Sequence, residues 1–302
     1  MEFLYLLEKI RFPLLNEIML AITLLGDEIA FLTVALLVFW CVDKRRGYYL
    51  MSVGFVGTVT SQLMKLACRI PRPWVRDPGF TALEEALEGA GGYSFPSGHS
   101  QSSVGTFGSI AVTEKKPWIR NICIAVMILV PFSRMYVGVH TPADVLVGSG
   151  LALALIFLLR PLVFREDGKG MKWLIAGMLL LAIGYLIYVE CFPFPADVDM
   201  GNLTSGRKNA YTLLGCTVAV AIVYPAERKF VNFPTAAVWW AQILKVALGL
   251  ALVLAVKEGL RAPLEAALPV LVARSARYFL VVVTAGLLWP MSFQFFSKLG
   301  RK

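Results

Sequence analysis

Charge and histidine are both scarce in this chain of 302 residues: charged side chains make up 16% of it, and only two residues are histidines. Hydrophobic residues make up 58%, and the mean hydropathy is +0.69. A chain with so little polar surface cannot hide its apolar residues in one soluble core, which excludes an ordinary soluble domain. The composition therefore predicts an integral membrane protein.

Cysteine is sparse as well, and its residues are scattered, mostly within apolar runs, with no Cys-x-x-Cys pair. This spacing supports neither a disulfide framework nor a metal site. We interpret the cysteines as small core side chains. They are Cys41, Cys68, Cys123, Cys191 and Cys216.

The sequence also lacks a basic patch of the kind that binds nucleic acid, although its formal net charge is +9. Its lysines and arginines occur in small groups beside apolar runs, without interleaved aromatic residues. Membrane topology explains such groups better than a nucleic-acid partner does. The sequence indicates no oligomeric state.

The N-terminal residues 1–17 lack the basic start and the clean apolar core of a secretory signal, because Glu, Lys and Arg are mixed with Leu and Phe. We expect residues 1–26 to form an interfacial amphipathic helix. The apolar stretch Leu14 to Leu25 is separated from the next apolar run by Gly26-Asp27-Glu28. A half-inserted hairpin is the alternative for this stretch.

Apolar runs then recur along the rest of the chain with short polar breaks. They are continuous rather than alternating, which predicts helices and not a barrel, since backbone groups in lipid must bond within their own segment. The predicted fold class is all-α, a polytopic bundle of transmembrane helices. The predicted spans cover roughly 27–42, 48–68, 98–113, 118–134, 142–160, 173–192, 210–225, 236–256 and 277–296.

Basic residues collect at alternate breaks between these runs, which should be cytoplasmic. The intervening segments 69–97, 134–141, 193–209 and 257–276 then face outward. Both histidines, His99 and His140, consequently lie at the outward side. The basic groups are Lys44-Arg45-Arg46, Lys115-Lys116 with Arg120, then Arg160, Arg165, Lys169 and Lys172, then Arg228-Lys229, and last Lys298, Arg301 and Lys302.

Three cations stand beside the apolar runs on this outward side: Lys65, Arg72 and Arg134. Such charges are costly near lipid unless they meet water or an anion, and the spans offer no series of carboxylates to pair with them. A phosphate is the natural partner, because Arg offers a planar fork and Lys a point charge. Taken singly, each is equally well explained as a basic residue reaching toward lipid headgroups.

Two helix starts lie at the same membrane depth. In Pro96-Ser97-Gly98-His99, Ser97 is a plausible N-cap and Gly98 permits close approach of an anion to the backbone. Residues 141–144 repeat this pattern with Thr141 as N-cap, and Asp144 either completes a capping box or orients the imidazole of His140 four residues before it. Two helix starts would thus point at one anion.

The chain resembles the type 2 phosphatidic acid phosphatase (PAP2) superfamily over roughly residues 48–160. The resemblance rests on three motifs in order: Lys65 followed seven residues later by Arg72-Pro73, then Pro96-Ser97-Gly98-His99, then Ser133-Arg134 followed by His140 and Asp144. Lipid phosphate phosphatases, bacterial phosphatidylglycerophosphate and undecaprenyl pyrophosphate phosphatases, glucose-6-phosphatase and the vanadium haloperoxidases belong to this superfamily. More loosely, residues 25–28, residues 40–43 and the spans after 172 resemble the sphingosine-1-phosphate phosphatase branch.

The resemblance implies a role for each motif residue. His140 would be the nucleophile that forms a phosphohistidine, Asp144 would orient it, and His99 would protonate the leaving oxygen. No metal and no cofactor is implied, because cations and a helix start stabilise the phosphoryl charge. The implied phosphate-binding residues are Lys65, Arg72, Ser97, Gly98 and Arg134.

The expected protein is a metal-independent phosphatase that hydrolyses lipid phosphate monoesters, such as phosphatidate or sphingosine-1-phosphate, at the extracytoplasmic face of the cell membrane. The domain organisation expected is 1–26 as the interfacial helix, 27–170 as the PAP2-type catalytic core, and 171–302 as additional C-terminal transmembrane helices. Within enzymes, a polyprenyl (undecaprenyl) pyrophosphate phosphatase or a lipid phosphotransferase is the alternative. Outside enzymes, a lipid transporter or flippase is the alternative, and membrane spans around the motifs disfavour a haloperoxidase.

The sequence supports further predictions for one loop, two charged residues and one C-terminal segment. The outward loop between Trp74 and Phe95 is either a lid or ordinary solvated loop, and Glu190 and Lys245 either lie near span ends or line a substrate channel. Residues 258–277 mix charged residues with Leu, Ala and Val, which predicts an amphipathic helix lying along the lipid headgroups.

Overall fold

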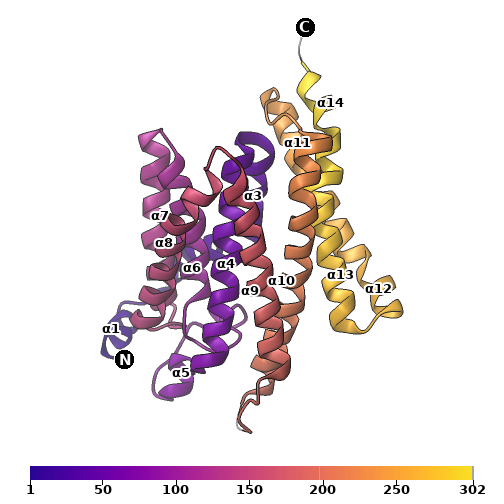
Figure 1. The fold of residues 1–302 in the computed structure, drawn as a ribbon. Helices are drawn as coiled ribbons and strands as arrows, with labels where there is room; N and C mark the ends of the chain where they lie inside the picture. Colours follow the sequence, from indigo (N-terminus) through magenta and orange to yellow (C-terminus); the bar gives the residue numbers. More distant parts are fainter. Residues whose placement is uncertain (197, 301–302) are drawn as a thin grey trace. The chain divides into compact units, whose positions relative to one another are not determined.

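The computed structural model describes residues 1–196 and 198–300, and within them the chain forms helices and no strand. This confirms the all-α fold class. The α-helices are α1 (Glu2–Lys9), α2 (Pro13–Thr23), α3 (Glu28–Leu37), α4 (Lys44–Cys68), α5 (Pro73–Arg76), α6 (Gly98–Thr113), α7 (Pro117–Tyr136), α8 (Pro142–Val163), α9 (Lys169–Cys191), α10 (Met200–Ala226), α11 (Trp239–Gly259), α12 (Arg261–Ala267), α13 (Val270–Val283) and α14 (Phe293–Lys298) (Figure 1).

Short 3₁₀ and π turns connect or extend several of these helices. The 3₁₀ turns are η1 (Leu24–Gly26), η3 (Glu84–Ala86) and η6 (Trp289–Ser292), and the π turns are η2 (Val38–Val42), η4 (Glu227–Val231) and η5 (Thr284–Leu288).

Six helices in the described part of the chain are long and apolar enough to cross a membrane: Pro117–Tyr136, Pro142–Val163, Lys169–Cys191, Met200–Val231, Trp239–Ala267 and Val270–Lys298. A seventh is present if Pro13–Gly26 and Glu28–Val42, which are bent by 54° at their junction, form one broken span. Every predicted span is helical, but the two at 48–68 and 98–113 do not meet this standard. The protein is thus a multi-pass membrane protein.

Both exceptions, α4 and α6, carry signature residues. α6 has only 16 residues, and five of its polar side chains are buried. When a helix buries polar side chains against its neighbours, its mean hydropathy is low even though it lies inside a bundle. The buried polar residues of α6 are Ser100, Gln101, Ser103, Thr106 and Ser109.

The chain divides into two compact units, of which the first comprises residues 1–32, 49–160 and 195–205. In this unit α6 packs along α7, α2 packs on α7, and the η1 turn packs on α6. Every signature residue belongs to it. The domain boundaries at 26 and 170 stay a prediction.

The N-terminal 26 residues form two helices and a turn rather than one amphipathic helix. Pro13 starts α2 at a position where a missing N–H is tolerated, after a break at residues 10–12. Arg11 in this break donates hydrogen bonds to the carbonyl oxygens of Tyr136 (3.0 Å) and Thr81 (2.7 Å). The segment is therefore fastened to the end of α7, and its place at the membrane interface remains a prediction.

The second unit comprises residues 33–48, 161–194 and 206–302 and contains the C-terminal helices. Lys245 on α11 is buried and donates to the Thr235 carbonyl at 2.9 Å, while Glu190 lies 3.6 Å from Arg207. These contacts give both charges partners inside the unit. The predicted helix over 258–277 is split among the end of α11, α12 and the start of α13, with a break before Val270.

Candidate functional site

The predicted nucleophile His140 lies in the turn between α7 and α8, and 1% of its surface is exposed. Gly138 makes this turn possible, because its φ of 86° is left-handed and an added Cβ would lie 2.8 Å from Arg11. Arg72 Nη1 donates to the Val139 carbonyl and lies 2.9 Å from His140 Nε2. Since a guanidinium only donates, Nε2 is the accepting nitrogen and Nδ1 carries the hydrogen.

The charge state of His140 follows from this setting. Burial lowers its pKa well below the ordinary value, and the neighbouring cations Arg72 and Lys65 lower it further. The imidazole is therefore neutral near pH 7 and keeps a lone pair on Nε2. Burial also lowers the pKa of Arg72, to about 10, which still leaves its guanidinium charged at neutral pH.

Asp144 holds both positions that its sequence spacing allows. Its Oδ2 accepts a hydrogen bond from the Thr141 amide at 2.7 Å, and the same oxygen lies 3.6 Å from His140 Nδ1. The carboxylate thus caps α8 and faces the imidazole at once. Ser94, which sequence reasoning missed, donates to Asp144 Oδ2 at 2.6 Å and lies 3.5 Å from His140 Nδ1.

The other predicted cations are anchored by one loop. Arg72 donates to the carbonyls of Gly91 (2.9 Å) and Gly92 (3.0 Å), and Lys65 Nζ donates to the Tyr93 carbonyl. This end of the 74–95 loop is thus fastened to the site. Ala86 and Ala90 in the same loop are buried in an apolar cluster.

Arg134 is the cation with the most unused bonding capacity. It is 2% exposed, and its Nη1 donates to Thr23 Oγ1 at 2.8 Å. Its Nε and Nη2 are buried without a hydrogen-bond partner among the described residues. Buried, unpartnered donors on a charged group are unfavourable unless a ligand satisfies them. An oxyanion with two or more oxygens is the ligand that a guanidinium fork fits.

The predicted helix start at Ser97 is confirmed, because α6 begins at Gly98 and Ser97 Oγ accepts from the Ser100 amide at 3.4 Å. Ser97 N–H donates to the Asp144 carbonyl at 2.9 Å, which joins the two helix starts. The side chain of Ser97 is thus occupied by capping. No atom of residues 1–196 and 198–300 lies within 4 Å of a Cβ added at Gly98, so space lies open beside its backbone.

His99, in the first turn of α6, is partnered by a residue that sequence reasoning missed. Its Nε2 lies 2.6 Å from Oδ1 of Asp27, at the junction of η1 and α3. His99 also lies within electrostatic reach of Arg134 and Arg72. Since Arg72 contacts His140, the structure gathers both predicted histidines around the same cations.

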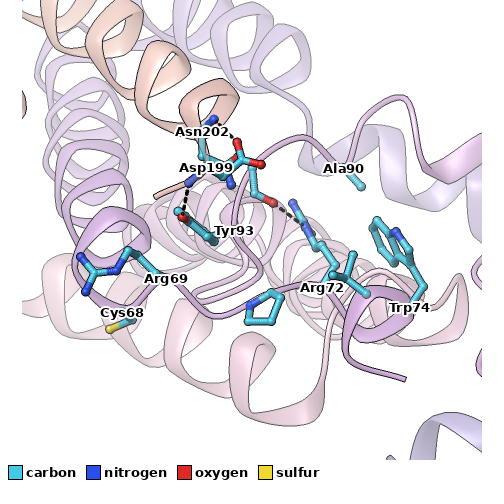
Figure 2. A pocket seen from close by; sticks show the side chains of 11 residues that line it. Cys68, Arg69, Arg72, Trp74, Ala90, Tyr93, Asp199 and Asn202 are labelled. Carbon is cyan, nitrogen blue, oxygen red and sulfur yellow. Dashed lines mark hydrogen bonds between the residues drawn. The ribbon is translucent and has the colours of Figure 1, made fainter. Parts of the chain in front are cut away.

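A cavity of about 640 Å³ opens beside Arg72 (Figure 2). The start of α10 forms one wall, where the Asp199 amide donates to Tyr93 Oη at 3.3 Å and the Asn202 amide donates to Asp199 Oδ1 at 2.7 Å. Half-buried Arg69, with a left-handed φ of 50°, lines another part. The cavity is large enough for the polar part of a lipid.

Comparison with known proteins decides the family. Residues 45–167 match the model of the PAP2 superfamily. Phosphatidylglycerophosphatase B of Bacillus subtilis is 31% identical over 165 residues, which are 50% of this chain and 76% of that protein. The chain belongs to the PAP2 superfamily. The signature residues, named above from sequence, all lie inside the matched region.

Other PAP2 relatives differ in the lipid that their names specify. Undecaprenyl-diphosphatase of Sulfolobus acidocaldarius is 31% identical over 147 residues, covering 48% of this chain and 68% of that protein. Sphingosine-1-phosphate phosphatase 2 of Mus musculus is 24% identical over 217 residues, covering 70% of this chain and 59% of that protein. No solved structure matches.

The C-terminal helices are part of the same family pattern. Residues 211–302 match a model described as the transmembrane extension of PAP2 superfamily phosphatases. The expected additional transmembrane helices are thereby confirmed. Together with the relatives, this makes the protein a membrane lipid phosphatase of the PAP2 family.

Proposed function

We propose that the protein hydrolyses lipid phosphate monoesters through a phosphohistidine on His140. The observation that carries this proposal is the set of bonding groups around Arg72 and Arg134. Among the residues that the structure describes, two buried donors of Arg134 have no partner, and Arg72 donates to the accepting nitrogen of a neutral imidazole. Such a site favours a tetrahedral oxyanion placed within reach of a nucleophile.

The first half of the reaction transfers the phosphoryl group to the enzyme. Arg72 and Arg134 bind phosphoryl oxygens, with Lys65 and the Gly98 amide adding positive charge. As Arg72 Nη1 turns from His140 Nε2 to a phosphoryl oxygen, the lone pair of Nε2 is freed and attacks phosphorus. The bond from phosphorus to the lipid oxygen breaks as the new P–N bond forms. His99 gives its proton to the leaving oxygen, so the lipid departs as an alcohol.

The second half returns the enzyme to its starting state. His99 is neutral after the first half of the reaction. A water molecule attacks phosphorus, and its proton passes to His99, which becomes protonated again. The P–N bond breaks, its electron pair returns to His140 Nε2, and inorganic phosphate leaves. Asp144 and Ser94 keep the Nδ1 side of His140 in place through both halves.

The side of the membrane follows from charge rather than from the site itself. Basic groups fall at the breaks opposite those that carry His99 and His140. The proposed active site therefore faces the extracytoplasmic side of the cell membrane. At this depth the apolar tail of a substrate stays among helices while its phosphate meets the cations.

The test is a panel of lipid phosphates presented in detergent micelles to purified wild type and to His140→Ala. The panel contains phosphatidate, sphingosine-1-phosphate, phosphatidylglycerophosphate and undecaprenyl diphosphate, and released phosphate is measured. We expect turnover of at least one monoester by wild type and none by the variant. Exclusive turnover of the diphosphate would replace the monoester proposal, and activity in a folded His140→Ala would remove the mechanism.

A parallel assay in excess EDTA tests the role of metals. Among the described residues, no three His, Cys, Asp or Glu side chains are grouped to hold a metal ion. Because protein cations surround the proposed phosphate position, we expect unchanged turnover in EDTA. Loss of activity that added magnesium restores would contradict this expectation.

A further inference from the structure

Residues 23–27 carry two side chains that reach the signature residues. Asp27 Oδ1 lies 2.6 Å from His99 Nε2, and Thr23 Oγ1 accepts a hydrogen bond from Arg134 Nη1 at 2.8 Å. Both lie before residue 45, where the match to the family model begins. The site of this chain thus includes residues outside the matched region.

We propose that Asp27 is the positioning residue of the general acid: its carboxylate fixes the ring of His99 and stabilises the protonated imidazole. This inference rests on the proposed phosphatase mechanism. Under this inference each histidine has its own carboxylate partner: His140 faces Asp144, and His99 faces Asp27. In each case a carboxylate sets which ring nitrogen is left for chemistry.

The contact identifies that nitrogen for His99. An ionised carboxylate only accepts hydrogen bonds, so His99 donates through Nε2–H to Asp27. The proton that reaches the leaving oxygen therefore comes from Nδ1. After this transfer the imidazole is neutral and still bonded to Asp27 through Nε2–H. In the second half of the reaction, Nδ1 takes the proton of the attacking water.

The surroundings of Asp27 favour this role over a purely structural one. Its side chain is 39% exposed and that of His99 is 18% exposed. Ion pairs with this much access to solvent contribute little to folding stability. Asp27 directly precedes α3, where an aspartate commonly caps the helix through its side chain, yet Oδ1 is directed to His99.

The η1 turn places Asp27 against the imidazole. Gly26 lies so close to α6 and α7 that an added Cβ would be 3.1 Å from His99 Cβ and 2.8 Å from Val130 Cγ1. Only a residue without a side chain permits this approach. The turn therefore packs closely against both helices, and Asp27, the next residue along the chain, is directed at His99.

The experiment compares leaving groups that need protonation to different degrees. Purified Asp27→Asn is assayed with phosphatidate, whose alcohol leaves poorly without a proton, and with p-nitrophenyl phosphate, whose phenolate leaves readily. We expect kcat/KM to fall about 10- to 100-fold for phosphatidate and less than about 3-fold for p-nitrophenyl phosphate. Glu28→Gln, the exposed neighbouring acid, is the matched control and should leave both values unchanged.

Two further variants separate positioning from other effects. His99→Ala should show the same dependence on the leaving group, and adding Asp27→Asn to it should cause no further loss, because the two residues act as a unit. In Asp27→Asn, the alkaline limb of the pH profile should also move to lower pH, since an amide stabilises the imidazolium less than a carboxylate does.

Defined outcomes overturn the inference. Equal losses with both substrates, no loss with either, or independent losses for Asp27→Asn and His99→Ala would each show that Asp27 does not act through the general acid. Asp27→Glu, which keeps the carboxylate, provides the second variant if the asparagine variant is not recovered folded, and it should retain more phosphatidate turnover than Asp27→Ser. Activity in His140→Ala would instead refute the phosphohistidine mechanism.

Discussion

At the scale of single residues, the site contains two buried arginines, Arg72 and Arg134, and neither forms a close ion pair with a carboxylate of the described residues. Two buried donors of Arg134 have no partner in the described part of the chain, and Arg72 donates hydrogen bonds to main-chain carbonyls and to an imidazole. Neither arrangement neutralises the positive charge. A bound phosphate would satisfy these donors, so we expect ligand binding and stability to be coupled.

Replacing Arg134 tests this coupling. Arg134→Met should lower kcat/KM about 10²- to 10³-fold, the typical effect of removing a donor to a transition-state oxyanion. Without ligand, its melting temperature should not fall, because a buried charge lacking full hydrogen bonding is replaced by an apolar side chain. Inorganic vanadate should raise the melting temperature of wild type and not that of the variant. Arg120→Met, an exposed position on the same helix, is the control; equal vanadate stabilisation of Arg134→Met would argue against the phosphate site.

The protonation of His140 sets the pH dependence. Because its pKa is lowered by burial and by neighbouring cations, Nε2 stays unprotonated until the pH falls well below about 6.5. We expect kcat/KM to hold through mildly acid pH and to fall only at lower pH, as the nucleophile gains a proton. A profile of kcat/KM from about pH 4 to pH 8 measures this limb. An acid limb centred at or above the ordinary histidine value would contradict the lowered pKa.

At the scale of elements, two helix starts pack against each other beside the proposed phosphate position. The Ser97 amide donates to the Asp144 carbonyl, and Gly148 on α8 brings that helix against the Ser97 backbone. A Cβ on Gly148 would lie 2.5 Å from the Ser97 carbonyl oxygen. The turn that precedes α6 therefore requires a glycine on its neighbour.

Gly148→Ala should displace this turn. We expect a loss of about 1–3 kcal/mol in unfolding free energy from overpacking, and a loss of kcat larger than the change in KM because the Gly98 amide moves. Gly150→Ala on the same helix meets no atom within 4 Å and serves as the matched control. Thermal unfolding and phosphatidate kinetics of both variants provide the comparison, and identical behaviour of the two would show that the contact is unimportant.

The elements also show what sequence could and could not predict. Lys65, Arg72, His99, His140 and Asp144 can be predicted as site residues from sequence, because their types and spacing form motifs that indicate chemistry by themselves. Thr23, Asp27 and Ser94 carry no such local signal, and their partners are 111, 72 and 50 residues away in the chain. Hydropathy likewise located α4 and α6 as helices, although neither is both long and apolar enough to count as a membrane-crossing helix on its own, and α6 is short and buries polar side chains.

At the scale of the whole molecule, the sided distribution of charge predicts where the site opens. A single cysteine is introduced at the exposed Gly89 in a variant whose native cysteines are replaced; an added Cβ there meets no atom of the described residues within 4 Å. An impermeant thiol reagent applied to intact cells should label it. A cysteine at Asp167, in the opposite loop, should react only after permeabilisation; the reverse pattern would invert the proposed orientation.

The central claim is that His140 carries the phosphoryl group between the lipid and water. Wild type is mixed with phosphatidate labelled with ³²P on its phosphate, quenched within milliseconds in alkali, and analysed for protein-bound label. A labelled protein that is stable in alkali and labile in acid is expected, and it should be absent from folded His140→Ala. Label retained by His140→Ala, or turnover by wild type with no label on the protein at any time, would contradict the mechanism.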